Sequence, residues 1–197
     1  MPRARAQTPE DVLAAAMRQF WQHGYHATSV QDLVRSTGTS RHILYSDAGG
    51  KHELYTKCFA AYREQVVDPA ARVLEESHDG LEALAAYFEM QICLAEKDGL
   101  PGPGCMIANA MTEIAPHDPA IAALVTAHHN RLTAAFAAAL RRAAPDTPDT
   151  ETEELAEFLF TSAQGLWALS RTVKTAAPLR SYAATLLDLI SSRFHSS

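Results

Sequence analysis

The side chains best suited to chemistry outside a protein core gather in one stretch, TSVQDLVRSTGTSRHILYSDAGGK, which runs from Thr28 to Lys51. It supplies hydroxyl groups, a guanidinium group, an imidazole, a phenol ring and an ammonium group. A guanidinium group bonds guanine edges or phosphate, whereas hydroxyl and ammonium groups bond phosphate oxygens. This combination predicts an interface with double-stranded DNA. The candidate DNA-binding residues are Thr28, Ser40, Arg41, His42, Tyr45 and Lys51.

Two short predicted helices position these side chains. Thr28 caps the first helix, and Gln31 follows three residues later, as in a capping box. Gly38 makes the turn, and the second helix covers roughly 40–46 with Leu44 pointing inward. Two short helices around a glycine turn predict a helix-turn-helix unit, whose second helix lies in the major groove. A simple solvated bend is the alternative, but it does not explain the short helices and the aromatic ring together.

A longer helix is expected on each side of this pair. The first begins at Thr8-Pro9, a good cap followed by a residue that suits the first helical position, and it ends at Gly24. The fourth runs from about Gly50 to Ser77. Asp47 lies between the pair of short helices and this fourth helix. It either caps the fourth helix or accepts a hydrogen bond from a cytosine amino group.

Charge is divided unevenly along the chain. The 197 residues contain 17 Lys and Arg against 23 Asp and Glu, a net charge of -6. Up to Lys57 there are seven basic and five acidic residues, so the excess of acid lies entirely in the remainder. DNA phosphates repel an acidic body and attract a basic end. We therefore expect the N-terminal end to be the face that approaches DNA.

The remaining composition indicates a cytoplasmic protein. Three cysteines at irregular spacing argue against a disulfide framework and fit a reducing compartment. No apolar stretch follows Met-Pro-Arg-Ala-Arg, so we expect no signal peptide, and no segment is long enough to span a membrane. We expect no cofactor and no metal site, because the adjacent His128 and His129 point in different directions on a helix.

The segment GYHATSVQDLVRSTGTSRHILYSDAGGKHELY resembles the DNA-binding segment of TetR/AcrR-type transcriptional regulators. The matching pieces are Gly24-Tyr25, Thr28-Ser29-Val30, Asp32-Leu33, Thr37-Gly38, Ser40, Leu44-Tyr45, Lys51 and Leu54-Tyr55. The resemblance implies an all-α homodimer of about nine helices per chain. A three-helix DNA-binding domain at residues 1–50 would precede a helical ligand-binding and dimerisation domain at residues 51–197. It further implies a repressor that a small-molecule effector releases from a double-stranded operator.

The most distinctive piece of the second half is LPGPGCMIANAMTEIAPHDP, in which Cys105 opens a predicted helix. Unpaired N–H groups and the helix dipole lower the pKa of a thiol in that place, which predicts a reactive cysteine. With Glu113 eight residues on, the arrangement resembles TetR-type repressors that sense electrophiles or oxidants. The other interpretation, which we favour, is a small buried hydrophobic residue at the start of the helix. The candidate ligand-binding residues are Cys105, Met106, Asn109 and Trp167.

Two further interpretations concern enzyme activity and assembly. A cysteine-dependent all-helical enzyme would use Cys105 as nucleophile and His117 or His128 as base, but the sequence places no acid to orient the histidine. Separately, the last two predicted helices are more apolar than a surface helix needs, which predicts a two-fold four-helix interface. Its expected members are Leu155, Phe158, Leu159, Leu166, Trp167, Leu186, Leu187 and Ile190.

Overall fold

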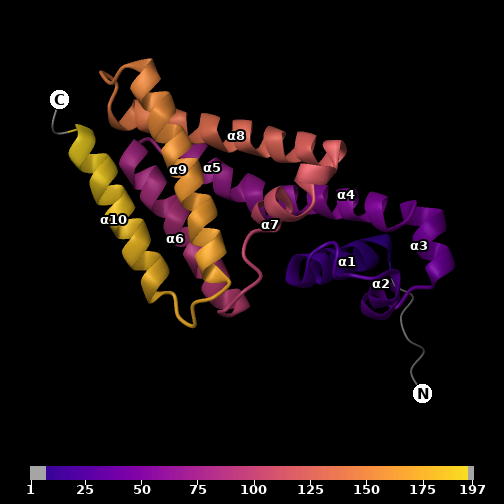
Figure 1. Cartoon of the computed structure of the whole chain (residues 1–197). Coiled ribbons are helices and arrows are strands. Elements are labelled where there is room, and N and C mark those ends of the chain that lie inside the picture. Colours follow the sequence, from indigo (N-terminus) through magenta and orange to yellow (C-terminus); the bar gives the residue numbers. More distant parts are fainter. Residues whose placement is uncertain (1–7, 195–197) are drawn as a thin grey trace.

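The computed structural model describes residues 8–194, and every regular element in that range is helical, which confirms the all-α fold class (Figure 1). The residues 1–7, on which the signal-peptide expectation falls, lie outside this range. The helices are α1 Pro9–His23, α2 Val30–Thr37, α3 Arg41–Ala48, α4 Lys51–Tyr62, α5 Asp68–Glu76, α6 Gly80–Asp98, α7 Met106–Glu113, α8 Pro119–Ala143, α9 Asp149–Ser170 and α10 Ala177–Phe194. We call α1–α3 the three-helix unit and α5–α10 the helical body.

The caps of the first two helices follow from short polar sequences. Thr8 and Asp11 form the capping box expected for α1. The cap expected at Thr28 is wrong, because Ser29 and Asp32 form the capping box of α2. Thr28 is fully buried, and its hydroxyl donates to the Gly24 carbonyl at 2.7 Å. Both adjacent residues carry a hydroxyl, and the carboxylate three residues after Ser29 decides between them.

The turn between α2 and α3 is the one that the sequence predicts. Gly38 has a left-handed backbone with φ of 64°, which glycine adopts without steric cost. Ser40 then caps α3, and Leu44 is buried against the rest of the unit. The capping role considered for Asp47 is wrong, because Gly50 precedes α4 and makes no side-chain cap. Asp47 instead accepts a hydrogen bond from the Ser46 hydroxyl at 2.5 Å.

The long helix expected between Gly50 and Ser77 exists but is not regular. A π-helical segment, Arg63–Val67, joins α4 to α5, and the backbone stays helical through both junctions. Pro69 follows at the start of α5 and has no N–H to donate, so wider helical turns before it accommodate the ring. Figure 1 shows α4 leading from the three-helix unit and α5 continuing into the helical body.

The helical body packs α6, α8, α9 and α10 around aromatic side chains. Tyr87 and Phe88 of α6 meet Phe136 of α8, with ring centroids 5.1 and 6.3 Å away respectively. Gly80 lets α6 cross α8 closely, since a Cβ there would lie 2.0 Å from the Ala139 carbonyl oxygen. The short helix α7 lies between α1 and the rest of the helical body (Figure 1). None of the helices within residues 8–194 is long and apolar enough to cross a membrane.

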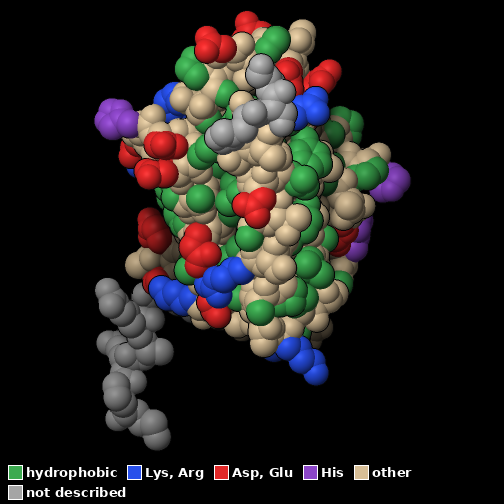
Figure 2. Space-filling view, turned by 90° about the vertical axis from the view of Figure 1, so that its left-hand side faces the viewer, with side chains coloured by type: hydrophobic (Ala, Val, Ile, Leu, Met, Phe, Trp, Pro, Cys, Tyr) green, Lys and Arg blue, Asp and Glu red, His purple; other side chains and the backbone are tan. Residues whose placement is uncertain are grey.

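The apolar surface of the last two helices differs from the one expected. Leu159, Leu166 and Ile190 are buried within the chain, as are Trp167 and Leu186. Only Phe158 of the expected set is a large exposed hydrophobic residue, while Leu155 and Leu187 are half-buried. The apolar side chains that do reach the surface of α6, α9 and α10 are Met90, Phe158, Leu169, Tyr182 and Leu189. Figure 2 views the side on which α10 lies, where apolar side chains are spread among charged ones.

Candidate nucleic-acid interface and ligand pocket

The outer face of α3 carries the predicted nucleic-acid contacts. Ser40, Arg41 and His42 are exposed where the helix begins, and Tyr45 follows one turn later with 48% of its surface exposed. The Arg41 guanidinium carbon lies 5.8 Å from the centroid of the Tyr45 ring. A flat cation and a phenol therefore stand side by side on a helix narrow enough to enter a major groove.

One apolar residue on this face was not among the predicted contacts. Ile43 is 44% exposed, although a solvated helix has no need for an isoleucine there. An apolar side chain at such a place contacts the methyl group of thymine. The signal in the sequence was the apolar residue next to Leu44, which cannot share the buried face of the same helix with it.

Two of the predicted DNA contacts, Thr28 and Lys51, are less exposed than those on α3. Thr28 is buried and bonded within the chain, so its hydroxyl is not available to phosphate. Lys51 is half-buried, and its ammonium nitrogen lies 4.2 Å from the centroid of the Tyr25 ring. Burial lowers the pKa of the Lys51 ammonium, and the Glu113 carboxylate opposes that change. Lys51 is the first residue of α4, and its ammonium group packs against the aromatic ring of Tyr25.

Glu113, at the end of α7, joins the helical body to the three-helix unit. Its carboxylate accepts hydrogen bonds from the backbone N–H groups of Tyr25 and His26 at 3.0 and 2.7 Å. Gly24 makes room for this, because a Cβ there would lie 2.8 Å from the carboxylate, and its φ of 84° also favours glycine. A second link joins His52 to Asp118 at 2.6 Å, between the start of α4 and the cap of α8.

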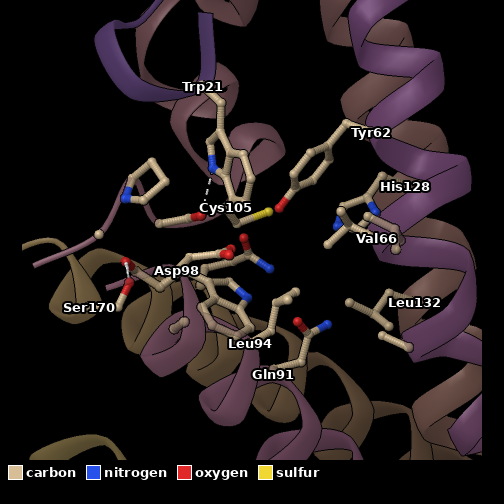
Figure 3. A pocket seen from close by; sticks show the side chains of 18 of the residues that line it. Trp21, Tyr62, Val66, Gln91, Leu94, Asp98, Cys105, His128, Leu132 and Ser170 are labelled. Atoms are coloured by element: carbon tan, nitrogen blue, oxygen red, sulfur yellow. Dashed lines mark hydrogen bonds between the residues drawn. The ribbon is translucent and has the colours of Figure 1, made fainter. Parts of the chain in front are cut away.

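A third link reaches the opposite end of α7. The indole N–H of Trp21 in α1 donates to the Gly104 carbonyl at 2.7 Å, directly before Cys105 (Figure 3). The loop that carries Gly104 is also bonded to the helical body. The Pro103 carbonyl accepts from the Asn109 amide at 2.9 Å and from the Arg171 guanidinium at 2.8 Å, and the Gly102 N–H donates to the Ser170 carbonyl at 3.1 Å.

This loop and Trp21 close one side of a pocket with a cavity volume of about 40 Å³. Figure 3 shows Trp21 and Tyr62 on one side, Gln91 and Leu94 on the other, and Cys105 between them. The apolar and aromatic residues of the wall are Trp21, Tyr62, Val66, Val67, Ala70, Tyr87, Leu94, Ala95, Leu132 and Trp167. The more polar ones include Gln91, Asp98, Cys105, His128, Gln164 and Ser170.

The structure brings together two of the four predicted ligand-binding residues. Cys105 and Trp167 line this pocket. Met106 does not, because it is 1% exposed in the core. Asn109 holds the loop through Pro103 and faces a different, larger hollow that Gly24 and Glu113 also line. Sequence reasoning missed Trp21, because its place in the wall depends on a contact with a loop more than 80 residues away.

The lowered pKa considered for Cys105 is wrong, and its burial agrees with the other interpretation, a small buried residue at the start of a helix. Cys105 does precede α7 as its N-terminal cap, but it is only 7% exposed. Burial raises the pKa of the thiol, and the hydrogen bonds from Ala108, Tyr62 and Ile107 only partly oppose it. Desolvation of a thiolate therefore outweighs the favourable end of the helix.

The two histidines considered as bases are placed differently. His128 lines the same pocket as Cys105, whereas His117 is exposed on the turn Ala115–His117. Burial lowers the pKa of His128 to about 4. The pocket therefore holds a neutral thiol and a neutral imidazole, not the thiolate and imidazolium of a cysteine nucleophile and its base.

Comparison with known proteins gives matches over most of the chain. Residues 12–58 match the family described as bacterial regulatory proteins, tetR family, and residues 80–186 match the tetracyclin repressor-like C-terminal domain. The chain is 31% identical over 182 residues to the HTH-type transcriptional repressor ComR of Escherichia coli (strain K12), covering 90% of this chain and 86% of ComR.

Further likenesses extend over similar lengths. An uncharacterized HTH-type transcriptional regulator of Bacillus subtilis (strain 168), YezE, is 31% identical over 75% of this chain and 78% of its own. Among solved structures, a cysteine mutant of the TetR family regulator CifR with 26-bp double-strand operator DNA superposes with a TM-score of 0.83. It is 25% identical, over 94% of this chain and 98% of the CifR chain.

Proposed function

The chain belongs to the TetR family of bacterial regulatory proteins, and on that premise we propose that it is a repressor whose hold on its operator is released by a small molecule. DNA binding and transcriptional regulation follow from the family. The effector and its site are our proposal. The observation that carries it is that Trp21, a residue of the three-helix unit, forms part of the pocket wall.

We assign DNA reading to α3. Arg41 would bond a guanine edge or a phosphate, Tyr45 would reach the backbone, and Ser40 and His42 would contact the same groove wall. Ile43 joins this set as an apolar contact. Lys51 remains a candidate phosphate contact, whereas Thr28 acts by holding the turn before α2. We place the boundary of the DNA-binding domain at residue 50, where Gly49 and Gly50 separate α3 from α4.

We propose a homodimer formed through α9 and α10. The exposed side chains of Phe158 and Leu169 on α9, and of Tyr182 and Leu189 on α10, support this. Gly165 is exposed between the two on α9, and a Cβ there would meet no other atom of the chain within 4 Å. A second copy could therefore approach α9 closely. Two recognition helices would then read a near-palindromic operator.

We propose that the effector binds without forming a covalent bond. The buried Cys105 thiol, whose pKa burial raises, is a wall residue and a poor nucleophile in this conformation. For the same reason we propose that the protein is not a cysteine-dependent enzyme. Since its partner would be bacterial DNA, we place it in the cytoplasm.

A gel-shift assay tests the repressor function. The full chain is titrated at fixed salt against a labelled duplex from the region upstream of its own gene. Unlabelled copies of that duplex, and an equal mass of unrelated DNA, serve as competitors. We expect only the matching duplex to displace the complex. Equal displacement by unrelated DNA would mean that the binding is non-specific and that this region holds no operator.

A further inference from the structure

We propose that the pocket takes a mainly apolar molecule that carries no negative charge and has one hydrogen-bonding group, and that this ligand makes room for itself by displacing Trp21. The inference names the ligand class and the regulation of the pocket, and for its effect on DNA it rests on the proposed function.

The lining determines the class of ligand. Aromatic and aliphatic side chains form most of the wall, and none of the described residues that line the pocket is Lys or Arg. Asp98 adds a carboxylate to the lining. An anion would find no counter-charge here and would meet this carboxylate, so it is excluded.

Two polar atoms determine where the hydrogen-bonding group lies. His128 Nδ1 and Gln164 Oε1 are buried without a hydrogen-bond partner, and both residues line the pocket. His128 is 95% buried, and its ring is neutral at pH 7. Buried polar atoms without partners cost free energy. A ligand hydroxyl or amide N–H recovers part of that cost by donating to Gln164 Oε1 or to an unprotonated His128 Nδ1. A ligand without such a group recovers nothing.

The size of the pocket means that a wall must move. Its cavity volume is about 40 Å³, whereas an apolar cavity of roughly 150 Å³ holds a molecule the size of benzene. The helical walls are held in the core, where Tyr87, Leu132 and Trp167 are all buried. The side formed by Trp21 and the loop before Cys105 is the one that can open.

The bonds at this side decide which part moves. Three hydrogen bonds, from Asn109, Arg171 and Gly102, tie the loop to the helical body. A single bond, from the Trp21 indole to Gly104, ties it to the three-helix unit. A ligand that enters between Trp21 and the loop breaks only the bond from Trp21 to Gly104, whereas moving the loop would break three hydrogen bonds. Trp21 moves, and α1 moves with it.

This motion gives the coupling that a regulator needs. A ligand shifts an equilibrium only when it binds one state better than the other. Here the ligand fits only where Trp21 has withdrawn, while Glu113 still holds the turn after α1 at the far end of α7. The three-helix unit then turns about that contact, which changes the orientation of α3 relative to α4. Operator DNA binds the state in which Trp21 remains hydrogen-bonded to the loop.

Tryptophan fluorescence tests the proposal directly, because the chain has two tryptophans and both line the pocket. The full-length Trp167→Phe variant leaves Trp21 as the only tryptophan. Phenol, toluene and benzoate are similar in size and differ in hydrogen bonding and charge. We expect phenol to shift the Trp21 emission to longer wavelength with saturation, toluene to bind at least tenfold more weakly, and benzoate to give no shift.

A second variant assigns the preference to the two polar residues. Adding His128→Leu and Gln164→Leu to Trp167→Phe should bring the phenol and toluene affinities to within about twofold of each other. Gln65→Leu, at an exposed position on the π-helical segment, is the matched control and should keep the preference for phenol. Circular dichroism melting confirms that each variant is folded, and Gln164→Leu alone is used if the combined variant is not.

Three outcomes would overturn the proposal. They are equal binding of phenol and toluene, binding of benzoate as tight as that of phenol, and saturable probe binding, measured by calorimetry, that leaves the Trp21 emission unchanged. Absence of probe binding up to millimolar concentration would overturn it too. No DNA is present in these titrations, so a failure here is separate from a failure of the repressor function, which the gel shift reveals.

Discussion

The Cys105 thiol and the His128 imidazole line one pocket, and burial keeps both groups uncharged. Cys105 has the position before a helix that stabilises a thiolate on an exposed surface, yet its pKa rises because the thiol is buried. His128 loses protonation for the same reason. Sequence position correctly predicted that a helix begins at Cys105, but it gave the wrong sign for the shift of the thiol pKa, because burial depends on segments far apart in the chain.

The buried His128 predicts how stability depends on pH. Its pKa is about 4 in the folded protein and about 6.5 in an unfolded chain, so between these values the unfolded state binds more protons. The stabilisation is therefore complete above about pH 6.5 and is lost as the pH falls toward 4, by up to about 3 kcal/mol. Urea unfolding at pH 7.5, 6 and 5 measures this loss.

The matched variants for this prediction are His128→Leu and His117→Leu, the second at an exposed histidine. The first should remove most of the loss between pH 6.5 and 5, and the second should leave it unchanged. If His128→Leu retains the full loss, the pH dependence comes from other groups.

At the scale of elements, the features set by neighbouring residues could be predicted from the sequence, whereas contacts between distant segments could not. The turn at Gly38, the start of a helix near residue 40 and the inward Leu44 follow from neighbouring residues, so α3 and its exposed face could be predicted from the sequence. The role of α7 could not. Glu113 bonds a turn nearly 90 residues earlier, and Trp21 bonds the loop at the other end of that helix. Spacing along the chain carries no signal for such contacts.

A glycine substitution tests the link between α7 and the three-helix unit. Gly24→Ala places a Cβ 2.8 Å from the Glu113 carboxylate, whereas Gly99→Ala, at a similar positive φ, meets nothing within 4 Å. Both variants strain the backbone, so the difference between them isolates the contact. We expect Gly24→Ala to lower the free energy of unfolding by about 1–3 kcal/mol more than Gly99→Ala. Urea denaturation measures both.

A second substitution tests whether removing the Glu113 carboxylate relieves the clash caused by Gly24→Ala. Glu113→Ala in the Gly24→Ala background removes the carboxylate that the new Cβ meets, so the two substitutions together should cost less than the sum of their separate effects. Simple additivity would show that Gly24 and Glu113 are not coupled and that α7 is held in another way.

At the scale of the whole molecule, two surfaces face different partners. The chain after Lys57 carries the whole acidic excess, so the repulsion from DNA phosphates falls on that part and is weaker at the part that carries α3. The exposed apolar residues of α9 and α10 lie in the helical body and suit a second copy of the chain. The sequence led us to expect the interface on these two helices, and this stays a proposal. Most of the residues expected in it are buried in the core, because both faces of α9 are apolar.

Charged substitutions test the dimer. Leu189→Glu and Phe158→Glu alter side chains that are 58% and 47% exposed, so they should leave the monomer folded and dissociate the dimer at micromolar concentration. Ala60→Glu, exposed on α4, is the control and should remain dimeric. Sedimentation velocity gives the oligomeric state. A dimer unaffected by both substitutions would place the interface elsewhere.

The measurement that tests the account most directly is a DNase footprint of the full chain on the DNA upstream of its own gene. We predict two protected half-sites whose centres lie about 10 bp apart or a multiple of that. Arg41→Ala should weaken protection by about 1–3 kcal/mol, while Arg72→Ala, exposed on α5, should leave it unchanged. Protection that survives the combined Arg41→Ala and Tyr45→Ala variant at the same salt would contradict the claim that α3 reads the operator.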